Sequence, residues 1–381
     1  MTDFNAPPTL AAMPTEILCM IGSNLSGNEL GSIARASRRF RQIFITRVFE
    51  NIKFSGNMGR LTEQLASLLY GSSVPVMTLI KPFIKYATFQ IQGVTAPDDA
   101  IPSQVSKAGL TLISIFLRTM PQLKGAVFDL HLPHTQQVQF SRQLREAPRL
   151  YGPPSLRFLN SVEISGLNAI LRNYNTAPGA VQIPAWHGTR SYKAVRDRCP
   201  TLKALHLSRG YERKHRLFRS MDHKILELIN RDFNQLESLV LHEATSAHEE
   251  LYRGQFKTPK HFLELNRMID RLIVSLNAMP QLRRFAFTMW YKRLDKRLIR
   301  ADWSRQAGRE PLVDADLEDY YSALINHISK AVPRLEELCI TVQDPVFYSG
   351  KRINGQSDMM VEVGSFEHAS EKYRFPSVLI V

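Results

Sequence analysis

The chain has 381 residues, of which 44% are hydrophobic, 9% aromatic and 22% charged. This apolar fraction excludes a mostly disordered protein, because disordered chains have too few apolar side chains to form a core. At roughly 150 residues per domain, the length corresponds to two or three domains or to one elongated array of repeats. No apolar run approaches the roughly 20 residues that span a bilayer, which excludes a transmembrane helix.

The first residues carry no recognisable targeting signal. Lys and Arg are absent before Arg35, whereas secretory signals and transit peptides both need basic residues near their start. We therefore expect an intracellular protein without membrane contact, located in the cytoplasm, the nucleus or both.

The formal net charge of +14 favours anionic partners, such as nucleic acid, acidic protein surfaces or phosphorylated segments. Two basic clusters, 209–219 and 283–305, follow predicted strands, where the loops of repeat proteins often bind ligands. Arginine beside aromatic residues suits acidic or phosphorylated peptides and also a nucleic-acid backbone. A solvated helix face with tryptophan packed beneath it is the alternative. The candidate substrate-binding residues are Arg213, Lys214, Arg216, Trp290, Arg293 and Arg297.

No local motif for catalysis, metal binding or cofactor binding occurs. Glycine-rich phosphate loops, a Gly-x-Ser-x-Gly elbow, Cys-x-x-Cys and His-Glu-x-x-His are all missing. The densest histidine and carboxylate group, His242-Glu243 with His248-Glu249-Glu250, is interpreted as a solvated loop after a strand. We expect a protein that is not an enzyme and holds neither metal nor cofactor. The cysteines each lie in an apolar stretch, which predicts buried, inert thiols: Cys19, Cys199 and Cys339.

After a polar lead over residues 1–9, the segment Met13–Phe49 predicts three short helices. The first carries an apolar stripe, and Ser26 with Glu29 fits a capping box at the start of the second. The third predicts an apolar inner face and an arginine-rich wet face. The inner residues are Phe40, Ile43, Phe44 and Val48, and the wet-face residues are Arg35, Arg38, Arg39, Arg41 and Arg47.

This segment resembles an F-box of the fungal type. The resemblance rests on Met13-Pro14-Thr15-Glu16-Ile17-Leu18, on Glu29-Leu30 and on Ser37-Arg38-Arg39-Phe40-Arg41, which occur in the family's order. Met13 replaces the usual leucine, and Ile52-Lys53-Phe54 resembles the strand that commonly follows. The match covers about 40 of the 381 residues. A generic three-helix lead packed on the rest of the chain is the alternative.

The remainder repeats the phrase Leu-x-x-apolar-x-apolar, whose last residues alternate like a half-buried strand. Helical patterns precede four of the anchor leucines, so each unit predicts a helix, a turn and a strand. Because no single unit buries its own apolar face, such units stack. The anchors, 34 to 53 residues apart, are Leu123, Leu159, Leu202, Leu236, Leu282 and Leu335.

The predicted fold class is therefore α/β: a three-helix F-box followed by an irregular solenoid that resembles leucine-rich repeats, with a curved parallel sheet and outer helices. An ordinary α/β domain with parallel strands is the alternative. Asp344–Arg374 is expected to be a long loop, and Phe375–Val381 a last strand. The expected divisions are a flexible lead 1–9, an F-box 10–54, a linker with the first irregular repeat 55–109, and a repeat-like substrate-recognition domain 110–381.

The resemblance implies a substrate-recognition subunit of a Skp–cullin–F-box ubiquitin ligase. Its F-box would dock on a Skp-type adaptor and thereby on the cullin scaffold, and its repeats would hold an unknown protein substrate, acidic or phosphorylated. The alternative is a basic protein that binds nucleic acid or phosphopeptides and has a purely structural helical bundle. The candidate adaptor-binding residues, which include members of the bundle core, are Pro14, Ile17, Leu18, Ile21, Leu25, Leu30, Ile33 and Phe40.

Overall fold

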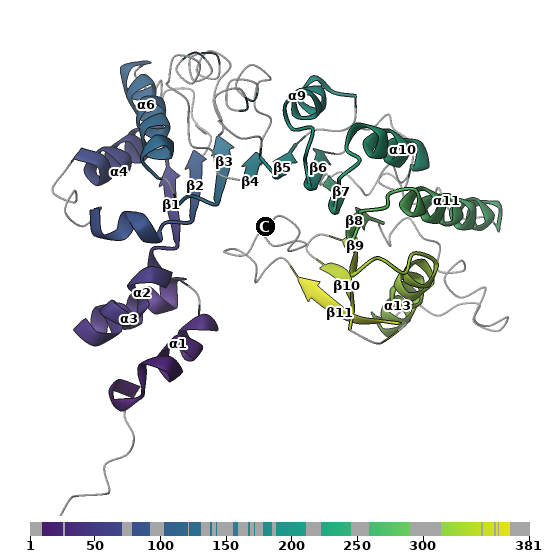
Figure 1. Ribbon diagram of the computed structural model, residues 1–381, viewed down its shortest axis with the longest axis horizontal. Helices are drawn as coiled ribbons and strands as arrows, with labels where there is room; N and C mark the ends of the chain where they lie inside the picture. The colour runs from purple at the N-terminus through teal and green to yellow at the C-terminus, as the bar shows by residue number, and fades with distance from the viewer. Residues whose placement is uncertain are drawn as a thin grey trace, which may run out of the picture. The chain divides into compact units, whose positions relative to one another are not determined.

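The chain divides into two compact units, Met1–Thr176 and Ala177–Val381, which are described separately. Figure 1 shows the computed structural model. It describes residues 10–25, 27–70, 78–91, 103–120, 122–130, 138, 142, 155–158, 167, 171, 178–184, 188–210, 222–244, 259–289, 314–343, 346–353, 356 and 358–365.

The first unit begins with the three helices that the apolar spacing predicts. A short 3-10 helix, Leu10–Ala12, precedes α1 (Thr15–Ser23), α2 (Gly27–Ala36) and α3 (Arg38–Val48). The Ser37 side chain caps α3 by accepting a hydrogen bond from the backbone N–H of Arg39 at 3.2 Å. Ser26, half of the predicted capping box, lies outside the described residues.

A parallel sheet follows the helices, with its strands in chain order. Phenylalanine occupies the same register position in neighbouring strands, since Phe54 pairs with Phe89 and Phe89 with Phe128. Their stacked rings lie 5.5 and 5.6 Å apart, and Phe116 of α6 packs edge-on against two of them. These rings form the core. The elements are β1 (Asn51–Gly56), α4 (Met58–Tyr70), the 3-10 helix Lys81–Phe83, β2 (Tyr86–Ile91), α6 (Ser103–Thr119), β3 (Gly125–Leu130) and β4 (Ser155–Phe158).

The sequence predicted only a linker and a poorly formed unit over residues 55–109. The structure instead has α4 and β2 there, and every residue of β2 is paired with both β1 and β3. Alternate β2 residues are buried, as in a regular half-buried strand. The Leu-x-x-apolar phrase does not precede β2, and for this reason the repeat search missed it.

The second unit also has strands in chain order, parallel from β5 to β9 and antiparallel from β9 to β11. Its helices lie on one side of the sheet, where the strand residues are apolar (Figure 1). The α/β prediction is confirmed. Among the described helices of the chain, none is long and apolar enough to cross a bilayer. The elements are β5 (Ala180–Ile183), α9 (Arg190–Arg198), β6 (Ala204–Gly210), α10 (His223–Asp232), β7 (Ser238–Ala244), α11 (Pro259–Asn277), β8 (Arg284–Thr288), α13 (Asp314–Ala331), β9 (Glu337–Gln343), β10 (Val346–Arg352) and β11 (Met359–Ser365).

Neighbouring strands of the second unit are joined at their starts by backbone hydrogen bonds. The acceptor is the carbonyl of the residue just before a strand, and the donors lie at the start of the next strand. The carbonyl of Lys203 accepts backbone hydrogen bonds from Glu237 and Ser238, at 2.8 and 2.9 Å. The carbonyls of Glu237 and Arg283 do the same for the next strands. Side chains at these positions form ion pairs, 2.7 Å for Lys203–Glu237 and 2.6 Å for Arg283–Glu336. Because these ion pairs are about half exposed, each contributes under about 1 kcal/mol, and the backbone bonds set the register.

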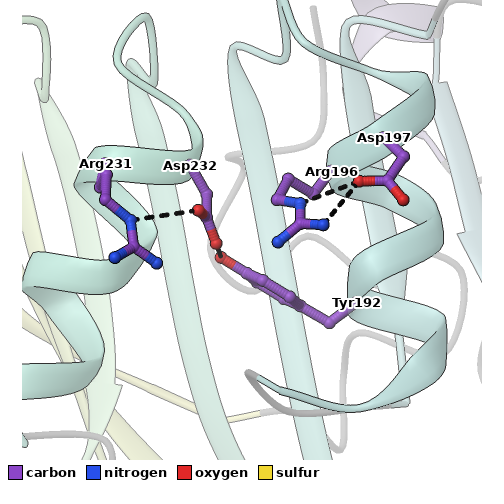
Figure 2. A network of polar contacts seen from close by, with 5 residues as sticks. All are labelled: Tyr192, Arg196, Asp197, Arg231 and Asp232. Carbon is purple, nitrogen blue, oxygen red and sulfur yellow. Dashed lines mark hydrogen bonds and ion pairs between the residues drawn. The ribbon is translucent and has the colours of Figure 1, made fainter.

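Side chains also link successive helices. The Tyr192 hydroxyl donates to Asp232 at 2.9 Å, joining α9 to α10 (Figure 2). Asn230 then donates to the carbonyl of Ala278, and Asn277 donates to that of Ala331, both at 3.0 Å. From α10 to α13 the helices are thus joined at their C-terminal ends, whereas α9 is joined to α10 through its first turn.

Tyr192 and Asp232 lie between two flanking ion pairs. Arg231 lies 3.6 Å from Asp232, and Arg196 pairs with Asp197 at 2.8 Å (Figure 2). Burial, followed by the hydrogen bond to Asp232, raises the pKa of Tyr192, so its hydroxyl stays protonated and remains a donor.

One expected strand lies outside the described residues, and two strands were missed. The frame placed a strand after Leu159, but residues 159–166 lie outside the described part of the chain, so that strand stays a prediction. β4, at Ser155–Phe158, lies just before Leu159, where the frame expected no strand. The 43-residue interval between Leu159 and Leu202 also contains β5, which the phrase did not detect. β5 is short and buried throughout, so it shows no alternation.

The expected loop 344–374 was also wrong, because it contains β10 and β11. Its glycines suggested a loop, yet two of them, Gly350 and Gly364, lie in strands where close packing leaves no room for a Cβ. A Cβ on Gly350 would lie 2.4 Å from Ile325 of α13, and one on Gly364 would lie 2.3 Å from the Phe347 ring. Phe375–Val381, the expected last strand, lies outside the described residues.

Replacing Tyr192 by Phe should lower the free energy of local unfolding around α9 and α10 by about 1–2 kcal/mol, because the hydrogen bond to buried Asp232 is lost. Hydrogen exchange of peptides from the two helices measures this change. Tyr70→Phe is the control, since Tyr70 is 65% exposed. Equal exchange rates in both variants would show that the hydroxyl does not join the helices.

Candidate docking surface on the N-terminal helices

The three N-terminal helices share a small core. Each contributes buried side chains to one cluster, around which further apolar residues are partly buried. Fewer than 40 residues give little core, so such a unit usually gains stability from a neighbour or a partner. The buried members are Leu18, Leu30, Phe40 and Phe44, and the partly buried ones are Met13, Leu25, Ile33, Ile43 and Val48.

Two arginines of α3 hold both ends of α1. Arg39 donates to the carbonyl of Met13 at 2.6 Å and also to that of Ala11. Arg47 donates to the carbonyl of Ser23, the last residue of α1, at 2.9 Å. The last carbonyls of a helix lack partners within it, so Arg47 satisfies one of them. Both side chains are on the surface, as predicted, but they serve to attach α1.

Gly22 allows α1 to approach α3 closely. It is buried, and a Cβ at this position would lie 2.7 Å from the edge of the Phe44 ring. The ring cannot easily move, because Phe44 is itself only 3% exposed in the bundle core. The position therefore requires glycine.

The structure separates the eight candidate adaptor-binding residues into three groups. Core members cannot touch a partner without opening the bundle, whereas the exposed ones can. The core group is Leu18, Leu30 and Phe40, the partly buried group is Ile21, Leu25 and Ile33, and the exposed group is Pro14 and Ile17.

Exposed Met20 and Leu10 extend this surface, and sequence reasoning missed both. Met20 is 64% exposed and Leu10 40%, beside 42% for Ile17. Pro14, Ile17 and Met20 recur at steps of three, which places them on one face of α1 and its N-cap. Residues 17–21 are all apolar, so α1 has a second apolar stripe besides the one in the core. This apolar set, Leu10, Pro14, Ile17 and Met20, is called the α1 face below.

One of the three cysteines contradicts the prediction of buried thiols. Cys19 is exposed, while Cys199 and Cys339 are buried. The apolar neighbours of Cys19 in the sequence do not imply that it is buried. Successive side chains of a helix are rotated by about 100°, so Cys19 points away from the direction of buried Leu18. Burial raises the pKa of Cys199 to about 12 and that of Cys339 well above its ordinary value.

The structure describes only part of the two other candidate regions, the histidine and carboxylate group at 242–250 and the basic clusters. His242 and Glu243 were interpreted as a loop, which was wrong, because both belong to β7. The His242 ring lies 6.2 Å from that of His206 on β6. Residues 248–250 lie outside the described part of the chain, and no group of three potential metal ligands occurs within the described part. All six candidate substrate-binding residues also lie outside it: Arg213, Lys214, Arg216, Trp290, Arg293 and Arg297.

Gly22→Ala should lower the stability of the bundle by about 1 kcal/mol, since overpacking against Phe44 exceeds the gain in helix propensity. Gly31→Ala is the matched control in α2, where a Cβ would meet nothing within 4 Å, and should raise stability by about 0.5–1 kcal/mol. Hydrogen exchange of peptides from 10–48 reports both effects. The close approach of α1 and α3 would be refuted if the two variants were stabilised alike.

Alkylation of the native protein at pH 8 should label Cys19 and leave Cys199 and Cys339 unmodified. The thiolate is the reactive form, and at pH 8 a thiol with a pKa of about 12 is almost entirely protonated. Mass spectrometry of tryptic peptides distinguishes the three sites, and labelling after denaturation provides the control. Native labelling of Cys199 as fast as Cys19 would contradict its burial.

A comparison with models of known protein families finds no match to this sequence, and a search among curated proteins finds none either.

Proposed function

We propose that the protein is the substrate-recognition subunit of a Skp–cullin–F-box ubiquitin ligase. The observation that carries the proposal is the α1 face, an exposed apolar stripe on a three-helix bundle whose core is already filled by other residues. The bundle resembles an F-box, and the α1 face is the part that would dock on a Skp-type adaptor.

The energetics favour a docking role for the α1 face. Full burial of one large apolar side chain contributes about 1.5–3 kcal/mol, so covering Ile17 and Met20 supplies a substantial part of a stable interface. Neither residue is needed for the core, which is made by Leu18 and its neighbours. Their apolar character therefore serves a contact outside the bundle.

The rest of the chain supports the finer fold, an irregular solenoid similar to leucine-rich repeats. Strand order follows chain order, and the backbone link at Lys203 recurs at Glu237 and Arg283. The link between C-terminal helix ends recurs as well, at Asn230 and at Asn277. Stacking of similar units through nearest-neighbour contacts is the defining property of repeat proteins.

In this proposal the protein itself breaks no bond. Its sheet and loops hold a protein substrate, acidic or phosphorylated, so that lysines of the substrate meet the ubiquitin-charged conjugating enzyme. Holding the substrate raises its effective concentration at the transfer site. The rival proposal, a basic protein that binds nucleic acid or phosphopeptides, draws on the net charge of +14 and on the basic clusters 209–219 and 283–305 of the sequence. The six candidate residues of these clusters lie outside the described part of the chain.

The double variant Ile17→Asp with Met20→Asp should fold and lose the adaptor, because two carboxylates would be buried without partners in the interface. Co-expression of the full chain with a Skp-type adaptor, followed by size-exclusion chromatography, measures the complex. Val274→Asp is the matched control, since Val274 is 68% exposed on the surface of α11. Leu18→Asp is unsuitable as a test, because it would disrupt the core.

A one-to-one complex of the wild-type chain and of Val274→Asp, absent for the double variant, would support the proposal. Protection of Cys19 from alkylation within the complex would place the adaptor on α1 independently of any substitution. Retention of the adaptor by the folded double variant, or no complex with a folded wild-type chain, would refute it and leave the bundle with a structural role.

A further inference from the structure

The second unit ends in an edge strand with unusual chemistry. The strand order stops at β11, and no described strand lies beyond it. An edge strand presents unpaired backbone N–H and C=O groups, and proteins usually protect such edges with lysine, proline or short strands. β11 has seven residues and contains neither lysine nor proline.

Two apolar side chains of β11 are exposed, although Met359 is buried. Met360 is 47% exposed and Val363 is 51% exposed, and Ile353, directly after β10, is 42% exposed. By comparison β1, the first strand in the order, has six residues and carries exposed Lys53. β11 is thus the edge suited to accept another strand.

A single carboxylate lies at the centre of β11. Glu362 is exposed and has no ion pair with any described residue. Asp358, just before the strand, is already paired with Lys330 at 2.9 Å. Lys351 of β10 is paired in register with Glu337 of β9; burial raises the pKa of the Glu337 carboxyl, and the charge of Lys351 opposes this shift. A negative charge in a chain of net charge +14 therefore remains available at this edge.

Charge decides between the occupants of the edge. In a symmetric antiparallel pair of two β11 strands using all seven residues, Glu362 would lie opposite Glu362, and like charges directly opposite are destabilising. A lysine or arginine at that position would form a favourable cross-strand pair instead.

We propose that β11 binds an extended segment of a partner protein by strand addition, with a basic residue of that segment opposite Glu362 and apolar residues near Met360 and Val363. Backbone hydrogen bonds provide most of the attachment, and the side-chain positions provide the preference. This site is separate from the α1 face and does not depend on the adaptor proposal.

The test uses the full chain and a fluorescein-labelled seven-residue peptide that alternates threonine and valine around a central lysine. Fluorescence anisotropy should show binding, with a preference of about fivefold over the same peptide with a central glutamate. Glu362→Lys should reverse this preference. Glu227→Lys, the same charge change on an exposed position of α10, should leave it unchanged.

Backbone pairing is tested with two versions of the peptide that are N-methylated at alternate residues. Only one set of alternate N–H groups faces the neighbouring strand, so one version should lose binding and the other should keep it. Equal binding of both, no binding of the unmodified peptide, or an unchanged preference in Glu362→Lys would overturn the proposal.

Two further outcomes would assign the edge to another occupant and overturn the proposal. A dimer of the wild-type chain in size-exclusion chromatography that dissociates when Val363 is changed to Asp would identify a second copy. Peptide binding that occurs only after removal of residues 366–381 would identify the chain's own C-terminal segment. Both measurements use folded protein, since Val363 is exposed and 366–381 follow the last described strand.

Discussion

The strands of both units depend on one backbone arrangement. The carbonyl of the residue before a strand accepts two N–H groups from the start of the next strand, as at Glu50, Lys85, Lys203 and Glu237. Once this register is set, alternate residues must face the same side along the whole sheet, because a shift of one residue would turn every side chain over. The helices can then cover a continuous apolar surface, from Leu205 to Leu338.

The N-terminal bundle follows a different constraint, which is the shortage of core. Leu18 of α1 packs in the core with Phe44 of α3, and Gly22 lets the two helices approach closely. Ile17 and Met20 of α1 remain exposed. The bundle thus combines a filled core with an exposed apolar surface on α1.

Much of the fold could be predicted from periodicity. The phrase anchored at Leu123, Leu202 and Leu236 correctly predicted β3, β6 and β7, because its apolar positions recur at every second residue, as at Leu205 and Leu207. β5 escaped because it is buried on both faces, and β10 because Gly350 resembles a loop residue until Ile325 is seen beside it. Such close approaches depend on residues distant in sequence, which no local pattern contains.

For the candidate docking surface, the sequence indicated a set of apolar residues but not which of them are exposed. Spacing indicated an apolar α1, but it could not say whether Leu18 or Ile17 points inward, because consecutive apolar residues fit two stripes equally well. The contact of Arg39 with Met13 joins residues 26 positions apart. That contact orients α1, and only the tertiary structure contains it.

Arg39 and Arg47 donate hydrogen bonds to main-chain carbonyls of α1 and of the turn before it. Every residue type has such a carbonyl. The attachment of α1 is therefore indifferent to the side chains that α1 presents outward. Substitutions at exposed positions such as Ile17 and Met20 can change the outer surface of α1 while the helix stays attached to α3. Within the nine residues of α1, the outward side chains are therefore independent of the bonds that hold the helix in place. The outward side chains can differ between related proteins at little cost in stability.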